Sequence, residues 1–241
     1  MAKNRLSNSL AQSLVDLHSQ HGYGYHQYFD WMIDDCLASC GIPLKNIPPE
    51  EVHSILFDLG QQYAQCVMES PPFYDVLGTV YMELVGQYGQ KALGQYFTPW
   101  PVASMMARMV YHDAVIPDVG LYRMSDPACG SGVMALAFAS SVMDSNGPEV
   151  LKRVSFTGID VDYLCARLFA LQLLGNCMIH RVELGEVLVF HGNALGPLDQ
   201  LNTVMHTTNR DLPINEYMPA KDIRREPMIQ QAATAEQLSL F

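Results

Sequence analysis

Residues 125–132, Ser-Asp-Pro-Ala-Cys-Gly-Ser-Gly, are the part of the sequence best suited to chemistry. They follow the run Leu-Tyr-Arg-Met at 121–124 and precede an apolar run at 133–138, so they predict a strand, a tight loop and a helix. Glycine reaches positive φ freely, and its missing Cβ lets a ligand press against the backbone. The loop also offers free N–H groups at the start of a helix, which suit a carboxylate or another polar group of a ligand. Two glycines alone are a weak indication, more often of a packing turn than of a binding site.

Other polar residues follow apolar strand-like runs further along the chain. The pattern predicts strands at 121–125, 154–159 and 186–191, with helices at 132–143 and 162–174 between them. Strands that alternate with helices of this length indicate parallel βαβ units. In a doubly wound sheet ligands bind at the carboxyl ends of the strands. We therefore expect Asp126, Asp160 and Asn193 to lie at one edge of one sheet.

The loop at 125–132 resembles the cofactor loop of S-adenosylmethionine-dependent DNA methyltransferases of the adenine-N6 kind. Upstream, Leu-Gly-Gln-Tyr-Phe-Thr-Pro at 93–99 resembles the Gly-Gln-Phe-Phe-Thr-Pro signature of the modification subunits of type I restriction systems. Downstream, 156–160 and 191–195 resemble the ends of the second and third strands of that family. The four motifs come in family order, and the resemblance covers roughly residues 75–195.

The resemblance implies S-adenosylmethionine as the cofactor and a set of residues that would hold it. Asp126 and the glycine loop would hold its methionine part. Asp160 would accept hydrogen bonds from its ribose hydroxyls, a task that suits an acidic side chain, and Asn193 would meet its adenine edge. Residues 96–98 would close over the methionine end. The full set is Tyr96, Phe97, Thr98, Asp126, Pro127, Ala128, Gly130, Ser131, Gly132, Asp160, Val161, Asn193 and Ala194.

The transfer step needs more than the cofactor site, because the lone pair of adenine N6 is delocalised into the ring. In the family this task falls to an Asn/Asp-Pro-Pro-Phe/Tyr tetrapeptide after the fourth strand. Its polar side chain and a backbone carbonyl accept the two amino hydrogens, and its aromatic ring stacks on the flipped base. No such tetrapeptide follows Asn193, although Asn209 or Asp211 could supply a polar group. Ser-Pro-Pro-Phe at 70–73 imitates it but reads as a linker between helices, a circularly permuted catalytic loop being the other reading. Activity of this chain alone is thus left open.

The sequence divides into three parts. Residues 1–92 predict an all-helical N-terminal region, because apolar residues recur at helical spacing over 25–40, 52–67 and 76–88. Residues 93–200 predict the S-adenosylmethionine-binding domain. Residues 201–241 predict an irregular tail with a short strand near 203–206. The alternation of strands and helices predicts an α/β fold class. The resemblance implies that this is a Rossmann-like S-adenosylmethionine-dependent methyltransferase fold, whose sheet need not be complete, preceded by the helical region.

Composition and net charge limit the kinds of protein that this chain can be. A hydrophobic fraction of 49% with 16% charged residues indicates a folded chain rather than a disordered one. The sequence shows no signal peptide and no membrane-span-length apolar run, which predicts a cytoplasmic protein. The net charge of −11, with 14 Lys and Arg, argues against strong DNA binding by this chain alone. The six cysteines form no Cys-x-x-Cys pair, so no metal site is expected.

The last five residues, Gln237, Leu238, Ser239, Leu240 and Phe241, resemble the peptide by which bacterial proteins dock on the replication sliding clamp. A polar tail that ends in apolar anchors suits such docking, and a frayed terminus is the other reading. Docking on the clamp would bring an acidic protein to DNA. Three hypotheses follow: an adenine-N6 methyltransferase that needs a partner or specificity subunit, a non-catalytic cofactor-binding regulatory module at the clamp, and an anti-restriction decoy.

Overall fold

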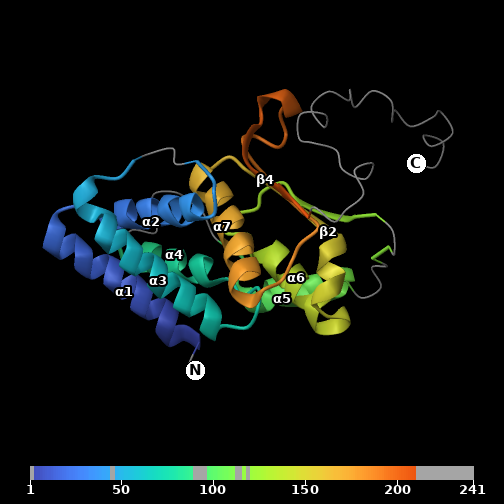
Figure 1. The fold of residues 1–241 in the computed structure, drawn as a ribbon, viewed down its shortest axis with the longest axis horizontal. Helices are drawn as coiled ribbons and strands as arrows, with labels where there is room; N and C mark the ends of the chain where they lie inside the picture. Colours follow the sequence, from blue (N-terminus) through green and yellow to red (C-terminus); the bar gives the residue numbers. More distant parts are fainter. Residues whose placement is uncertain (1–2, 44–46, 89–96, 112–115, 118–119, 210–241) are drawn as a thin grey trace.

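The computed structural model describes residues 3–43, 47–88, 97–111, 116–117 and 120–209. The N-terminal part consists of the helices α1 (Lys3–His21), α2 (Tyr25–Ser39), α3 (His53–Glu69) and α4 (Val76–Tyr88), with a short 3-10 turn, η1 (Glu50–Val52), before α3. Helix α1 packs on α2, α3 and α4, and these helices lie side by side in Figure 1. The three predicted helical segments are thereby confirmed.

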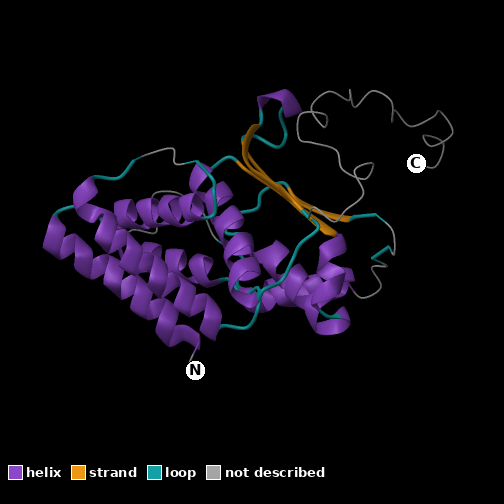
Figure 2. Cartoon of the chain, in the orientation of Figure 1, coloured by secondary structure: helices purple, strands orange, loops and turns teal. Residues whose placement is uncertain are grey.

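Figure 2 shows the strands gathered in one place, beside the helices. Within the described residues they form one mixed sheet in the order β1-β2-β3-β4. Strands β1 (Tyr122–Asp126), β2 (Val154–Asp160) and β3 (Glu186–His191) are parallel to one another, as the sequence predicts. Strand β4 (Asn202–Thr208) runs antiparallel to β3 at the outer edge. The expected short strand near 203–206 is therefore a full strand that extends the sheet, while residues 210–241 lie outside the described residues.

Helices connect and cover the parallel strands. Helix α6 (Val133–Asn146) and the 3-10 turn η2 (Pro148–Arg153) link β1 to β2, and α7 (Tyr163–His180) links β2 to β3. A parallel connection needs such a crossover because a tight turn cannot join two strands that run the same way. Helix α5 (Trp100–Tyr111) packs on α6, and the turn η3 (Leu198–Gln200) precedes β4.

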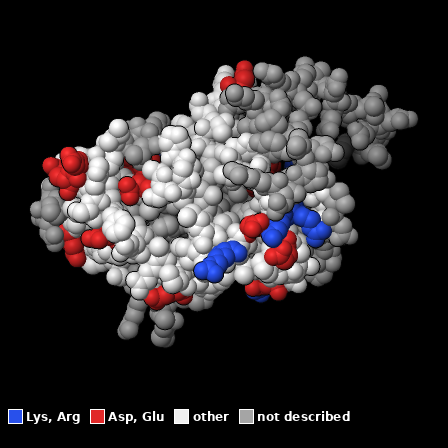
Figure 3. Space-filling view, viewed as in Figure 1, with Lys and Arg blue, Asp and Glu red and all other residues white. Residues whose placement is uncertain are grey.

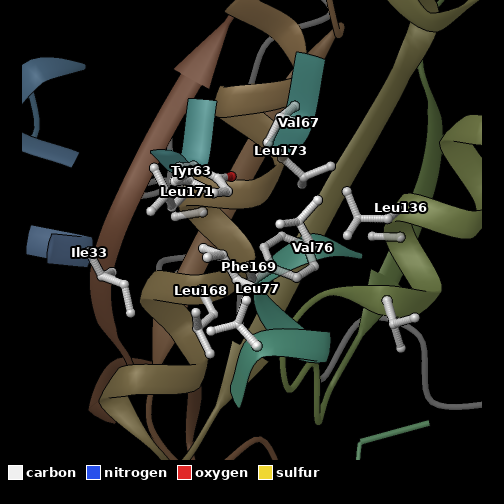
Figure 4. Packing of buried hydrophobic residues seen from close by; sticks show 14 of the residues in the cluster. Ile33, Tyr63, Val67, Val76, Leu77, Leu136, Leu168, Phe169, Leu171 and Leu173 are labelled. Atoms are coloured by element: carbon white, nitrogen blue, oxygen red, sulfur yellow. The ribbon is translucent and has the colours of Figure 1, made fainter. Parts of the chain in front are cut away.

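Helix α7 lies between the sheet and the helical region. It contacts β2, β3 and β4 as well as α2, α3 and α4. Helix α7 is covered on several sides and buries eleven of its eighteen residues, most of which are apolar. Figure 4 shows Leu168, Phe169, Leu171 and Leu173 of α7 with Ile33 of α2, Tyr63 and Val67 of α3, Val76 and Leu77 of α4, and Leu136 of α6. One core thus runs across the predicted boundary at residue 92, which itself stays a prediction.

The segment 70–73 connects α3 to α4, which confirms its interpretation as a linker. Phe73 is fully buried and adopts a positive φ of 61°. The Phe73 backbone N–H donates a hydrogen bond to the side-chain oxygen of Asn176 at 2.5 Å. A fully buried ring cannot stack on a base, so the structure does not support a permuted catalytic loop here.

Helix α5 places small residues inside and large apolar ones outside. Ala103 and Ala107 are buried, and α5 packs closely on α6. The large apolar residues Val102, Met105, Met106, Met109 and Val110 are all exposed, from 42% to 72%. The only charged side chain of the helix is that of Arg108. We call these five residues the α5 stripe.

Candidate functional site

The carboxyl ends of the three parallel strands bring the predicted polar residues together. Asp126 ends β1 opposite Gly158, and Asp160 ends β2 opposite His191, the last residue of β3. Asn193 follows β3 by two residues. Three segments that are more than thirty residues apart in the sequence thus meet at one edge of the sheet, where an α/β sheet binds its ligands.

The loop between β1 and α6 requires its two glycines. Gly130 and Gly132 have φ angles of 52° and 92°. Residues with a side chain rarely adopt this left-handed backbone conformation. A Cβ on Gly132 would lie 3.1 Å from the Phe169 ring, and one on Gly130 would lie 3.3 Å from the Phe97 ring. The turn therefore packs directly against α7 on one side and against Phe97 on the other.

Asp160 joins this loop to the end of β2. Its Oδ2 accepts a hydrogen bond from the Gly130 N–H at 2.9 Å, and its Oδ1 accepts one from the Asp162 N–H at 2.9 Å. The Cys129 N–H donates to the carbonyl of Ile159 at 3.0 Å. Asp160 is only 9% exposed. Each carboxylate oxygen can accept two hydrogen bonds, so Asp160 keeps the capacity to accept from a ligand.

Asp126 presents a second carboxylate at this edge. Its Oδ1 accepts a hydrogen bond from the Ala128 N–H at 3.1 Å, while Oδ2 has no partner within the described ranges. Burial raises the pKa of Asp126, with a further contribution from the charge of Asp160, although the bond from Ala128 opposes the shift. A cationic group of a ligand would relieve this repulsion.

The rest of the edge offers an amide and apolar surface. Asn193 is exposed, and its Oδ1 accepts from the Leu195 N–H at 3.0 Å, which leaves its NH₂ group to face outward. Val161 is 68% exposed. Pro127 and Ala128 are exposed, and Ala194 is half-buried. Carboxylates, an amide and apolar surface are what a nucleoside with an amino-acid chain requires, so the residues present fit S-adenosylmethionine.

The motif at 93–99 is described from Phe97 onward, and Tyr96 lies outside the described residues. Phe97 packs on the Tyr81 ring of α4, with a centroid distance of 4.9 Å, as well as on Gly130. Thr98 is half-buried just before α5. The aromatic ring of this motif therefore lies against the glycine loop.

Two predicted residues lie elsewhere. Ser131 is 1% exposed, and its hydroxyl donates to a carboxylate oxygen of Asp75 rather than facing the edge. Asn209 follows β4, and its N–H donates to Gly185 O at 2.8 Å, next to the first residue of β3. Because β4 is antiparallel, Asn209 lies at the opposite edge of the sheet from Asp160. Asp211 and residues 237–241 lie outside the described residues.

Sequence reasoning missed the buried residues behind the loop. Asp75 of the linker before α4 and Gln172 of α7 contact Ser131, and Arg167 of α7 bonds Asp34 of α2. The one available signal was a polar residue within an apolar helical stretch, which does not identify its partner.

The described ranges contain neither a cluster of metal ligands nor a helix that could span a membrane. No three His, Cys, Asp or Glu side chains gather there in a way that could hold a metal ion. No helix there combines the length and apolarity needed to cross a membrane.

Comparison with solved structures shows the fold. A Listeria monocytogenes protein described as a class I S-adenosylmethionine-dependent methyltransferase matches with a TM-score of 0.50 and 17% identity, over 81% of this chain. The chain spans 54% of the length of that protein. The methyltransferase subunit of a type I restriction-modification system from Streptococcus thermophilus matches with a TM-score of 0.36 and 21% identity, over 64% of this chain and 29% of that one. No curated protein matches significantly.

A family model gives the most direct assignment. The model described as N-6 DNA Methylase matches residues 73–236, which is more than half of the chain. The matched range includes the glycine loop, Asp160 and Asn193. The chain therefore belongs to the N-6 DNA methylase family.

Proposed function

We propose that this chain binds S-adenosylmethionine at the carboxyl edge of β1, β2 and β3 and takes part in the adenine-N6 methylation of DNA. The observation that carries the proposal is the bond from the Gly130 N–H to the Asp160 carboxylate, which joins the glycine loop to the acidic strand end. Membership of the N-6 DNA methylase family implies S-adenosylmethionine as the cofactor. A cytoplasmic location belongs to the same proposal.

Each residue of the edge has a task in this proposal. Asp160 accepts hydrogen bonds from the ribose hydroxyls, and Asp126 faces the ammonium group of the methionine part. Asn193 donates to the adenine, which Val161 and Ala194 flank. Residues 96–98 cover the methionine end, and the bound cofactor supplies an electrophilic methyl group.

The transfer step is proposed to need a partner protein. The adenine amine must have acceptors for its two hydrogens, and the base must have an aromatic surface, at the same edge as the cofactor. The Asn209 backbone N–H donates to Gly185, and its side-chain NH₂ donates to Glu183, which favours a different place for this side chain. The partner would therefore supply the missing half of the site and, as a specificity subunit does, the contacts to the DNA target.

Calorimetric titration with S-adenosylmethionine, followed by a labelled-methyl assay on mixed-sequence DNA, tests the proposal. Binding with transfer would establish an enzyme that acts without a partner. Binding without transfer would be the result expected of a subunit that needs its partner, and also of a cofactor-binding regulatory or anti-restriction module. Adding candidate partner subunits then separates these two. No binding at all would reject the proposal.

Recruitment to DNA through the sliding clamp is a second proposal. Its support is the sequence of residues 237–241, together with the net charge of −11, which disfavours unaided binding to DNA. We expect deletion of residues 237–241 to leave the unfolding temperature unchanged and to abolish co-elution with a bacterial sliding clamp. Absence of co-elution for the full-length protein would reject clamp recruitment without affecting the cofactor proposal.

A further inference from the structure

Asp75 is a buried carboxylate directly behind the glycine loop. It lies just before α4, some fifty residues ahead of the loop in the sequence, and it is 4% exposed. It takes no part in the edge of the sheet where a ligand would bind. A charged group buried at this depth costs free energy unless several donors surround it, so its contacts call for an explanation.

The carboxylate is held from three directions. Its Oδ1 accepts hydrogen bonds from Gln172 Nε2 of α7 at 2.6 Å and from the Gly78 N–H of α4 at 3.0 Å. Its Oδ2 accepts one from the Ser131 hydroxyl at 3.1 Å. Gln172 Nε2 also donates to the backbone carbonyl of Ser131 at 2.8 Å, and Gln172 Oε1 accepts from the Leu77 N–H at 2.9 Å. Ser131 is thus fixed both by its side chain and by its backbone.

Gly78 shows how closely these parts approach. A Cβ at this position would lie 2.2 Å and 2.5 Å from the two carboxylate oxygens of Asp75 and 2.6 Å from the Ser131 hydroxyl oxygen. No side chain fits there. Any residue larger than glycine would push the carboxylate and the loop apart.

We propose that Asp75 is a positioning residue for the cofactor loop. Its carboxylate, with Gln172, holds Ser131 in place between Gly130 and Gly132, and so sets the turn that brings the Gly130 N–H to Asp160. The inference rests on the proposed function only in so far as the loop holds S-adenosylmethionine. The positioning itself is a property of the protein without a ligand.

A simpler role for Asp75 is to cap α4 through the Gly78 N–H. Asparagine is an equally good helix cap, so a capping role predicts that Asp75→Asn changes nothing. Positioning predicts a loss, because the amide has one acceptor oxygen and cannot serve both Gln172 and Ser131 as the carboxylate does. With the amide oxygen turned toward Gln172 and Gly78, the NH₂ group would face the Ser131 hydroxyl. That hydroxyl would have to change from donor to acceptor, and a bond to a charged carboxylate would be replaced by a weaker neutral one.

Stability and positioning should separate in this variant. Burial raises the pKa of Asp75, although the hydrogen bonds from Gln172, Gly78 and Ser131 oppose the shift. A buried acid with a raised pKa costs stability at neutral pH, since the ionised form is less favourable in the folded state than in the unfolded one. Asp75→Asn should therefore retain or increase the free energy of unfolding at pH 7.

Three variants test the proposal: Asp75→Asn, Ser131→Ala and the matched control Ser141→Ala. Ser141 is also a buried serine, but its hydroxyl donates only to the Ala137 carbonyl within α6, at 2.9 Å. Ser131→Ala keeps the test decisive if Asp75→Asn does not fold. For each variant, amide hydrogen exchange of residues 129–133 is measured without ligand, together with the affinity for S-adenosylmethionine.

We expect loop exchange at least tenfold faster in Ser131→Ala and Asp75→Asn, with unchanged exchange in α3 and an affinity for S-adenosylmethionine reduced at least threefold. Ser141→Ala should change neither quantity. Unchanged loop exchange in both test variants would overturn the proposal. If the wild-type protein does not bind S-adenosylmethionine, the proposed function fails, and the exchange data still decide whether Asp75 positions the loop.

Discussion

At the scale of single residues, Asp160 carries the most direct prediction about binding. A hydrogen bond to a charged group contributes about 1.5–3 kcal/mol, so we expect Asp160→Ala to weaken S-adenosylmethionine binding at least tenfold in calorimetric titration. Part of this loss comes from the loop, because Asp160 also holds the Gly130 N–H.

Asp199→Ala is the matched control for this measurement. Asp199 is an exposed acid in the turn η3, so its removal changes the charge of the protein equally and leaves the edge of the sheet intact. Equal affinities of the Asp160 variant and the wild type would show that this carboxylate does not touch the cofactor.

The sequence predicts well the positions of residues that end a strand or occupy a special backbone conformation, while their roles toward a cofactor stay predictions. Asp126, Asp160 and the two glycines have a local cause, since strand ends and positive φ leave a pattern in neighbouring residues. For Asp75 and Gln172 no neighbouring residue identifies the partner, because their hydrogen bond joins positions 97 apart in the sequence. Ser131 belonged to the predicted cofactor set, yet its hydroxyl points to this buried pair.

At the scale of elements, Arg167 attaches α7 to the helical region. Its guanidinium group bonds Asp34 of α2 at 2.6 Å, also bonds Asp30, and lies 4.6 Å from the centre of the Tyr163 ring. The side chain is 5% exposed. Removing one partner of a buried ion pair leaves the other charge without compensation, which costs about 3–5 kcal/mol.

We therefore expect Arg167→Met to lower the free energy of unfolding in urea by about 3–5 kcal/mol. Arg108→Met is the control, because Arg108 is exposed on α5 and its replacement should change stability little. A similarly small loss for both variants would mean that the pair adds nothing to stability beyond packing.

Strand β4 is held to its neighbours by Glu186 of β3. Its carboxylate accepts hydrogen bonds from Ser155 Oγ of β2 at 2.7 Å and from His206 Nε2 of β4 at 3.2 Å. Burial raises the pKa of Glu186, but these bonds and the attraction of His206 and Arg123 outweigh burial, so the pKa lies below its ordinary value. A carboxylate with a lowered pKa stabilises the folded state at pH values above the ordinary glutamate pKa of about 4.3. This stabilisation is lost as the pH falls through the lower pKa of the folded state.

The expected consequence is a stability difference between the wild type and Glu186→Gln that depends on pH. The difference in unfolding free energy should be largest above about pH 5 and should shrink as the pH falls below about 4. Urea unfolding at a series of pH values measures it. A difference that stays constant, or grows towards acid, would contradict the assignment of this carboxylate as the ionised member of the cluster.

For most helices and strands of the sheet, the local sequence pattern is sufficient to predict the element. Strands β1, β2 and β3 and helices α6 and α7 were predictable because alternating strands and helices of this length permit one arrangement. The direction of β4 was not predictable. A run such as Asn202–Thr208 favours a strand in either direction, and its pairing depends on contacts such as the one between His206 and Glu186.

At the scale of the whole molecule, the shared core explains why the helical region belongs to the site. Helix α7 begins directly after Asp160 and Asp162, and it packs on α2, α3 and α4 along its length. The helical region therefore supports the helix that positions the acidic strand end. The predicted boundary at residue 92 falls between α4 and α5, outside the described residues, and one core includes residues from both sides of it.

The face of the molecule seen in Figure 3 agrees with the weak affinity for DNA that the net charge predicts. On the face seen in Figure 3, Lys and Arg occupy small areas while Asp and Glu are spread over several elements. A protein that binds DNA unaided usually presents a broad basic face. On this face the distribution of charge is consistent with the proposal that another protein recruits this chain to DNA.

The α5 stripe makes the molecule sensitive to peroxide. Met105, Met106 and Met109 offer their thioether sulfurs to solvent, whereas Met32 and Met205 are buried. Peroxide converts an accessible methionine into the sulfoxide, which is polar. Among the methionines of the described residues, mild treatment should therefore add about 16 Da, one oxygen atom per event, first at the stripe and at the exposed Met68 and Met178. Peptide mass spectrometry would show this order. Stored samples should accordingly become a mixture of masses. A thiol reagent that keeps cysteines reduced would not reverse this change, because methionine sulfoxide is reduced by dedicated reductases.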